Sequence, residues 1–320
     1  MFEVCCVGHL CADVLAKTVD ILPKKGQLGI LDDLKLRSGG CAMNAAIVLG
    51  KLGNLTTMVG KVGDDGFGRY LIDVLDANGV NADGLLKDPL SSTSASFVSI
   101  SSDGERTILH YLGSNKTICF EDVKLSFALN AKILFVGGTF LLPSFDGADC
   151  EKLLRFAKDN GQITALDTAW DVTGRWMAVI KDCIKHLDYF MPSYDEAVKL
   201  SGETECERIA DVFLKLGANS VVIKLGNKGC YVKESGGKRF YSQPFIVEAV
   251  DTSGAGDAFC AGFLTGLVKN MDIEDCAIFA NAVGALCVTA VGTTDGIKNF
   301  KQVQDFIAAQ KNSPMVLSII

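Results

Sequence analysis

Short apolar runs rich in β-branched residues alternate along the chain with longer segments in which apolar residues recur at helical spacing. This alternation is typical of βαβ units and predicts an α/β fold with a mainly parallel central sheet. Strands are predicted at 3–7, 57–59, 133–136, 164–166, 189–191, 221–224 and 230–232. Helices are predicted at 43–52, 68–77, 150–160, 194–200, 207–216, 257–269, 273–289 and 300–310. Several helices stop at a glycine that suits a left-handed cap, namely Gly53, Gly79, Gly161, Gly202 and Gly217.

Two stretches depart from this pattern. Residues 13–37 and 91–111 alternate in polarity without a helical period, and the second contains the turn sequence Ser102-Asp103-Gly104. Both are predicted to form β-hairpins or extended segments. The sequence has no internal repeat, low-complexity tract or proline-rich linker. We therefore expect a single α/β domain over residues 1–320, with these two segments inserted into it.

Composition and charge narrow the classes of function. The chain has 320 residues, 48% hydrophobic and 22% charged, which is enough to bury a large core. Its net charge is −7 and it has no block of lysine and arginine, so we expect no nucleic-acid partner. A small neutral or anionic ligand is compatible with this charge.

The twelve cysteines are scattered through apolar segments without a C-x-x-C pair, which predicts reduced core residues. The N-terminus lacks a basic stretch, and its apolar run is too short for a signal peptide. The most apolar helix, 277–291, contains Asn281 and falls short of the ~18 apolar residues of a membrane span. We expect a cytoplasmic protein without a membrane partner.

The most informative segment is 250–263, which reads VDTSGAGDAFCAGF. Gly254, Ala255 and Gly256 carry no bulky side chain, so their N–H groups can approach an anion where a helix begins. Asp257 follows directly and would lie beside that anion, where a carboxylate can take a proton from an attacking hydroxyl. The alternative is an ordinary capped helix after a glycine turn, for which Asp251 would serve as a cap.

This segment resembles the C-terminal signature of the ribokinase-like (PfkB) carbohydrate kinases. The resemblance implies that Asp257 is the catalytic base and that the amides of Gly254, Ala255 and Gly256 form an anion hole for the transferred phosphoryl group. It also implies a ribokinase-like three-layer α/β/α sandwich, in which strands from 13–37 and 91–111 form a small lid over the sugar. In that family the lid often pairs with a second subunit's lid, so a homodimer is expected.

A second segment, 38–46, reads SGGCAMNAA and resembles the N-terminal signature of the same family. It implies that Gly39, Gly40 and Asn44 line the sugar pocket, since glycine allows close approach and an amide pairs with vicinal hydroxyls. Asp13, which follows the first strand, matches the position that holds two sugar hydroxyls. Cys41 stands where many ribokinase-type members have lysine, which departs from the ribose-specific pattern.

Three further segments resemble family sites for ATP and its metal ion. Glu196 matches an acidic position that holds Mg²⁺ through water, although Ser193-x-x-Glu196 is also a helix capping box. The family's ATP-binding loop is matched by Lys224, Gly226 and Gly229. A plain β-hairpin turn would explain these glycines almost as well. Asn281 matches a helix residue beside the adenine.

Asp167 ends a strand at a position that lies near the phosphates in relatives, and Arg175 and Trp176 follow in a familiar pattern. Asp251 and Ser253, with the loop at 291–294, could supply oxygens for the monovalent cation of many relatives, so K⁺ is a possible cofactor.

The combined signatures predict an ATP-dependent sugar kinase that phosphorylates a primary hydroxyl with Mg²⁺. One alternative is a nucleoside kinase on the same fold, with Phe97 and Tyr111 as a wall for the base. Another is a sugar-binding regulator without catalysis. No G-x-G-x-x-G follows the first strand and no P-loop motif occurs, which argues against a nucleotide-dependent dehydrogenase. The sequence does not identify the sugar.

Overall fold

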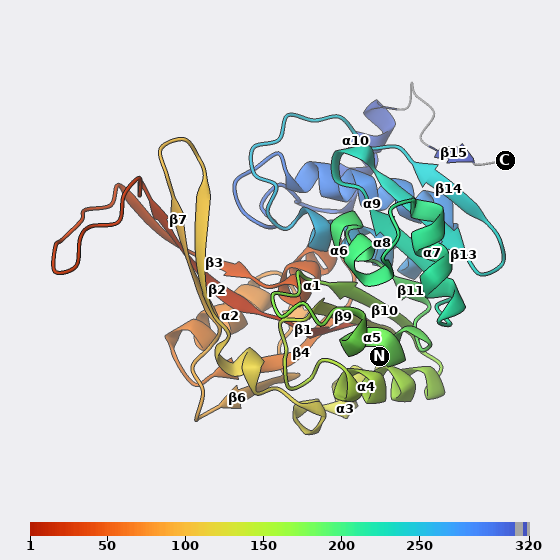
Figure 1. Ribbon diagram of the computed structural model, residues 1–320, viewed down its shortest axis with the longest axis horizontal. Helices are drawn as coiled ribbons and strands as arrows, with labels where there is room; N and C mark the ends of the chain where they lie inside the picture. Colours follow the sequence, from red (N-terminus) through yellow and green to blue (C-terminus); the bar gives the residue numbers. More distant parts are fainter. Residues whose placement is uncertain (311–315, 319–320) are drawn as a thin grey trace.

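The computed structural model describes residues 1–310 and 316–318 (Figure 1). Its central sheet has 11 strands in the order β15-β14-β13-β12-β11-β10-β9-β1-β4-β5, with β6 pairing β4. From β5 to β12 every pairing is parallel, and β13, β14 and β15 are added antiparallel. The sheet is therefore mainly parallel, as predicted.

The strands of this sheet are β1 (Phe2–Gly8), β4 (Thr56–Gly63), β5 (Val80–Asn81), β6 (Leu85–Asp88), β9 (Ala131–Thr139), β10 (Ile163–Thr168), β11 (Tyr189–Phe190), β12 (Ser220–Lys224), β13 (Cys230–Glu234), β14 (Arg239–Ser242) and β15 (Val316–Ser318). The α-helices are α1 (Cys41–Lys51), α2 (Gly66–Ala77), α3 (Leu125–Ala128), α4 (Ala148–Asp159), α5 (Met177–Ile184), α6 (Tyr194–Ser201), α7 (Cys206–Lys215), α8 (Ala255–Val268), α9 (Ile273–Cys287) and α10 (Phe300–Ala309). All seven predicted strands and all eight predicted helices are confirmed within a few residues.

Alternate residues of the strands enter two separate cores. In β1, Val4 and Cys6 belong to the core under α1, α8 and α9, whereas Cys5 and Val7 belong to the core under α4, α5 and α7. Strands buried on both faces read as continuous apolar runs, because neither face meets water. The result is the predicted three-layer α/β/α sandwich.

A second, four-stranded sheet is built from the two segments that break the helical rhythm. Its order is β3-β2-β7-β8, and its strands are β2 (Cys11–Lys17), β3 (Asp33–Gly39), β7 (Ala95–Ile100) and β8 (Arg106–Tyr111). This sheet projects from the body of the molecule (Figure 1). It is the predicted lid, and the turn at 102–104 joins its last two strands. That the whole chain is a single domain remains a prediction.

Local signals account for most element ends. The five glycines predicted to end helices all adopt positive φ, between 72° and 104°. The sequence analysis did not predict α5 and β14, because both are short and border irregular segments. All twelve cysteines lie in the described residues and are free, and all but Cys41 and Cys119 are buried, as expected of core thiols. Among the described residues, no helix combines the length and the apolar character needed to cross a membrane.

The carboxyl ends of the parallel strands meet the start of α1 and the start of α8. These two helices pack on each other on one face of the sheet, and α8 packs in turn against α9. Gly262 of α8 allows this close packing, because a Cβ there would lie 2.9 Å from the Cα of Ala280 and 3.0 Å from the Cβ of Val283. The position of the α8 N-terminus thus depends on a helix contact without room for a methyl group.

We expect Gly262→Ala to lower the free energy of unfolding by ~1–3 kcal/mol. The added methyl group would clash with the backbone of α9, and this cost exceeds the ~1 kcal/mol that alanine gains over glycine in helix propensity. Urea unfolding measures this change. The matched control is Gly66→Ala in α2, where an added Cβ meets nothing within 4 Å. Equal stability of the two variants would contradict the packing argument.

Candidate active site

Asp257 lies in the first turn of α8 and is half-buried. The Nδ2 group of Asn44, on α1, donates a hydrogen bond of 2.8 Å to Asp257 Oδ2. The hydroxyl of Thr293 donates at 2.9 Å to Asn44 Oδ1, which orients the amide. Burial raises the pKa of Asp257 to about 6, and the Asn44 hydrogen bond opposes this rise. A carboxylate with such a pKa is suited to accept protons near neutral pH.

The α8 helix begins without a side-chain cap. Its N-cap residue is Gly254, in the left-handed conformation with φ 76°, where a side chain would meet the backbone of Thr293. No side chain of the described residues caps the helix, and the Ala255 N–H has only a long hydrogen bond of 3.4 Å to the Thr252 carbonyl, so the start of the helix can accept an anion. The ordinary capped helix that we considered as the alternative is therefore not formed. The N-terminal turn has the geometry of an anion site.

A pocket of about 640 Å³ lies beside this turn. It is lined by Ala255 and Gly256 and by all four residues predicted to bind ATP, namely Lys224, Gly226, Gly229 and Asn281. The strands β12 and β13 are antiparallel, so the segment 225–229 is also the hairpin turn that we considered as the alternative. The two interpretations are compatible, because the turn itself forms one wall of the pocket. That these residues bind ATP remains a prediction.

The sequence analysis missed the opposite, largely apolar wall of this pocket. It consists of Pro244, Phe245, Ile246, Val247 and Ala249, in a loop after β14 that carries no motif. The side-chain nitrogen of Asn281, Nδ2, donates to the Ser242 hydroxyl at 2.9 Å and to the Gln243 backbone carbonyl at 3.1 Å. Asn281 therefore anchors the start of this loop. Direct contact between Asn281 and adenine remains a prediction.

Acidic side chains gather around Lys224 at the carboxyl edge of the sheet. Lys224 Nζ lies 2.6 Å from Asp167 Oδ1; the Asp167 side chain is buried and that of Lys224 is largely buried. Burial alone would lower the pKa of Lys224, but the carboxylates of Asp167 and then Glu196 more than offset it, so the pKa is raised. Lys224 is thus a fixed cation beside Gly256 of the anion site.

Glu196 forms the capping box predicted as its alternative role. Its Oε2 accepts from the Ser193 backbone N–H and from the Thr168 hydroxyl, both at 2.9 Å. The carboxylates of Asp167, Glu196 and Asp257 are close enough to influence one another's charge. Such a set of hard oxygen donors with one lysine fits a hydrated Mg²⁺ held partly by phosphates. Which residue holds the ion remains a prediction.

The predicted sugar residues form a continuous wall from the lid to Asp257. Asp13 of β2 packs directly against Gly39, and Gly40 lies against the backbone of His9. Asn44, one turn into α1, completes this wall by its contact with Asp257. Burial raises the pKa of Asp13, and its Oδ1 accepts a hydrogen bond of 3.3 Å from the Cys11 thiol.

The lid adds polar residues that the sequence analysis missed or set aside. Ser96 and His110 are paired across β7 and β8, and their side chains are 3.1 Å apart. Cys11 contacts Ser96 at 3.3 Å. His9, interpreted as structural, is buried with both ring nitrogens lacking a partner among the described residues, and it packs edge-on to His110. The strict alternation of β7 and β8 is the signal that could have placed Ser96 and His110 on one face.

Asp251 and Ser253, predicted to hold a monovalent cation, both contact a residue of the lid. Arg106 of β8 lies 2.8 Å from Asp251 Oδ2 and also donates to the Ser253 hydroxyl. No sequence signal pointed to Arg106, because it lies about 145 residues before Asp251 and the fold alone brings the two side chains together.

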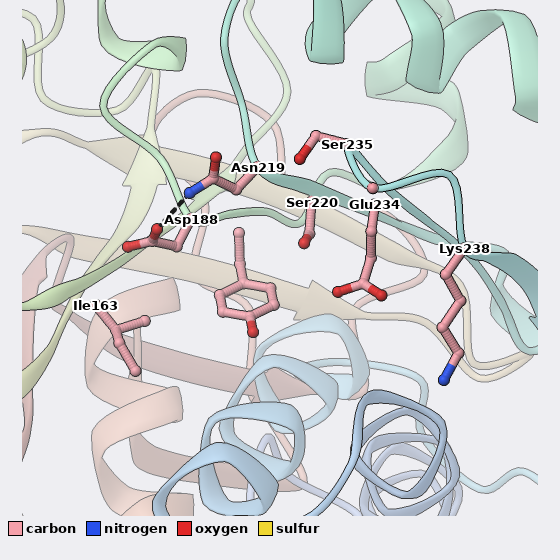
Figure 2. A pocket seen from close by; sticks show the side chains of 9 residues that line it. Ile163, Asp188, Asn219, Ser220, Glu234, Ser235 and Lys238 are labelled. Carbon is pink, nitrogen blue, oxygen red and sulfur yellow. Dashed lines mark hydrogen bonds between the residues drawn. The ribbon is translucent and has the colours of Figure 1, made fainter.

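A smaller depression of about 390 Å³ lies at the opposite edge of the sheet (Figure 2). Ile163 and Ser220, at the amino ends of their strands, line it together with Asp188. Asp188 Oδ1 accepts from Lys158 and from Asn219, both at 2.7 Å. Asp188 is thus already paired, and none of the predicted site residues is among the described residues that line the depression.

The comparisons with known proteins agree with this geometry. The model of the pfkB family carbohydrate kinase matches residues 1–299. Fructokinase-2 of Oryza sativa subsp. japonica is 31% identical over 292 residues, which cover 86% of this chain and 86% of that protein. The 2-dehydro-3-deoxygluconokinase of Bacillus subtilis is 28% identical, covering 85% of this chain and 87% of that protein.

Among solved structures, the ribokinase of Arabidopsis thaliana complexed with ribose and ATP has 27% sequence identity and a TM-score of 0.85. The alignment covers 98% of this chain and 99% of that one. The ribokinase-like fold is therefore confirmed, and the relatives are sugar kinases. Because the family match extends over nearly the whole chain, this protein is an enzyme that belongs to the PfkB family of carbohydrate kinases.

Proposed function

We propose that this chain transfers the γ-phosphoryl group of ATP to a primary hydroxyl of a free sugar. The observation that carries the proposal is the position of Asp257, held by Asn44 at the start of an uncapped helix beside a pocket of about 640 Å³. A base, an anion site and a nucleotide-sized pocket then meet at one point. The ribose and ATP named for the A. thaliana ribokinase support the assignment of the two substrates.

In this mechanism the sugar hydroxyl oxygen attacks the γ-phosphorus as its proton passes to Asp257. The bond from the γ-phosphorus to the bridging oxygen breaks, and ADP leaves. The N–H groups of Gly256 and its neighbours offset charge that develops on the phosphoryl oxygens. The Lys224 ammonium group lies beside Gly256, 3.4 Å from the position that a Cβ would take there, and it stabilises the same charge.

Different residues bind the two substrates. Asp13, Gly39, Gly40 and Asn44 hold the sugar, while the walls around Lys224 and Asn281 hold the nucleotide. Mg²⁺, when bound, neutralises phosphate charge, and Glu196 would hold it through water. The exposed Tyr111 and the half-buried Phe97 give no closed flat slot, so a free sugar is favoured over a nucleoside.

One prediction from this mechanism concerns the proposed base, Asp257. With Mg-ATP and a panel of hexoses, pentoses, sugar acids and nucleosides, one class of substrate is expected to produce ADP. Asp257→Asn should lower that turnover by about 10²–10⁴-fold, because proton transfer to the base is lost. Sugar binding, followed by thermal shift, should persist.

The control is Asp76→Asn, on the exposed side of α2, which should keep full turnover. Turnover by Asp257→Asn close to wild type would refute the mechanism. Turnover with nucleosides alone would favour the nucleoside kinase. Sugar binding without any ADP would favour the non-catalytic regulator.

A second prediction follows from the pKa of Asp257. Since the base must be ionised, kcat/KM should fall as the pH drops through about 6. The Asn44 hydrogen bond favours the carboxylate form, so Asn44→Ala should move this acidic limb to higher pH. The control Asn160→Ala, at the end of α4, should leave the limb unchanged. An unshifted limb in Asn44→Ala would assign the limb to a different group.

We also propose that two copies pair through the lid. All of β8 is exposed, and so are the apolar side chains of Leu34, Ile108 and Leu109 on the lid. Strand register places Leu34 and Leu109 on one face of the lid and Ile108 on the other, and a second copy would cover these exposed groups. A cytoplasmic location, in keeping with the twelve free thiols, remains a prediction.

Light scattering should find a dimer whose dissociation constant rises at least about tenfold in the double variant Ile108→Ser, Leu109→Ser. The matched control replaces Leu55 and Val172, which are equally exposed but lie off the lid. A monomeric wild type, or an equal effect of both double variants, would contradict pairing through the lid.

A further inference from the structure

Arg106 connects the lid to the loop that precedes the anion site. It is the first residue of β8 and pairs with Ile100, next to the turn of the lid hairpin. Its guanidinium lies 2.8 Å from Asp251 Oδ2 and donates to the Ser253 hydroxyl. The planar fork of arginine allows one side chain to reach two oxygens on different residues.

Both oxygens of Asp251 already have partners within the chain. Its Oδ1 accepts from the Ser253 N–H at 2.9 Å, and its Oδ2 accepts from the Gly292 N–H at 3.0 Å as well as from Arg106. The Asp251 side chain is 3% exposed, against 30% for Arg106. Burial alone would raise the pKa of Asp251, but Arg106 and the two N–H groups lower it to about 2. The carboxylate is therefore charged, and its charge is balanced by the Arg106 guanidinium.

These contacts do not fit the monovalent cation that the resemblance led us to expect. A potassium ion needs several free oxygens, and its main attraction would be an uncompensated negative charge. Here the charge of Asp251 is already balanced by a guanidinium, and the Ser253 hydroxyl is also engaged. An ion could enter only by displacing Arg106.

We propose that Arg106 supplies from the lid the positive charge that a bound monovalent cation would otherwise provide beside the anion hole. The proposal rests on the kinase function proposed above. Arg106 is a positioning residue: it holds Asp251, which fixes residues 251–253 to the loop at Gly292, and Gly254 of the anion hole follows directly. Turnover should then be independent of K⁺.

The same contact ties lid closure to the anion hole. The hairpin tip is fixed to the rest of the lid, because the Ser102 N–H donates to Asp20 at 2.7 Å and the Val19 N–H donates to the Ile100 carbonyl at 2.9 Å. The tip of the lid therefore moves as one unit, and Arg106 reaches Asp251 only while the lid lies over the site.

The test compares wild type with Arg106→Gln in tetramethylammonium chloride and in KCl at equal ionic strength. Wild-type turnover should be the same in both salts within about twofold. Arg106→Gln should lose about tenfold in tetramethylammonium, since a buried carboxylate is left unpaired, and should recover in KCl. Arg106→Lys, which keeps the charge but can engage fewer oxygens, should lose less and respond less to K⁺.

A second measurement needs neither ATP nor sugar. Potassium should raise the unfolding temperature of Arg106→Gln above its value in tetramethylammonium, and should leave that of wild type unchanged, because only the variant has a free site. The control Lys24→Gln removes the same charge from the lid, where Lys24 has no side-chain contact in the described residues, and should behave as wild type.

Two results would overturn the role that we propose for Arg106. Severalfold activation of wild type by K⁺ would overturn the proposal whatever the variants do. A potassium effect on unfolding that is equal in wild type and Arg106→Gln would overturn it as well. If no substrate of the panel is turned over, the kinase function fails, but the unfolding measurement still tests Arg106 independently.

Discussion

The hydrogen bond from Asn44 to Asp257 is the constraint on which the rest of the site depends. It joins two helices whose sequences lie 213 residues apart and which both begin at the carboxyl edge of the sheet. Because Thr293 donates to the amide oxygen, Asn44 can offer only its nitrogen to the carboxylate. One oxygen of Asp257 is thereby fixed, and its position relative to the anion hole is set by the packing of α1 on α8.

The partners of Asp251 and Asp257 explain why these two carboxylates differ in acidity. Asp251 is paired with a guanidinium and two N–H groups, and its pKa falls to about 2. Asp257 has as its closest partner a neutral amide, which offsets only part of the desolvation, and its pKa rises to about 6. Asp167 is bound to Lys224 at 2.6 Å and holds that cation in place. With a pKa of about 2, Asp251 is a poor proton acceptor near neutral pH, whereas the raised pKa of Asp257 suits the role of base that we propose for it.

Much of this arrangement could be predicted from the sequence, because it is local. The glycine run before Asp257, the apolar periods and the glycines that end helices act within a few residues, and they predicted the order of elements and the mainly parallel sheet correctly. The three layers were predicted from the resemblance to the family. Asn44 and Asp257 were each identified from their own segment, but their contact could not be. Arg106, Ser96 and the Phe245 wall were missed because each acquires its role only from strands and loops brought together by the fold.

The lid hairpin explains why the sugar in particular escapes prediction, and it also unites the two halves of the site. Ser96 and His110 lie at its inner end near Asp13, while Arg106 lies four residues from His110, a distance of ~13 Å along a strand. One rigid hairpin thus contacts the sugar wall at one end and the loop before the anion hole at the other. Because Arg106 contacts Asp251 and His110 pairs with Ser96 on the same hairpin, a displacement of the hairpin would change both contacts. In the proposed mechanism, the lid would therefore link recognition of the sugar to the loop before the anion hole.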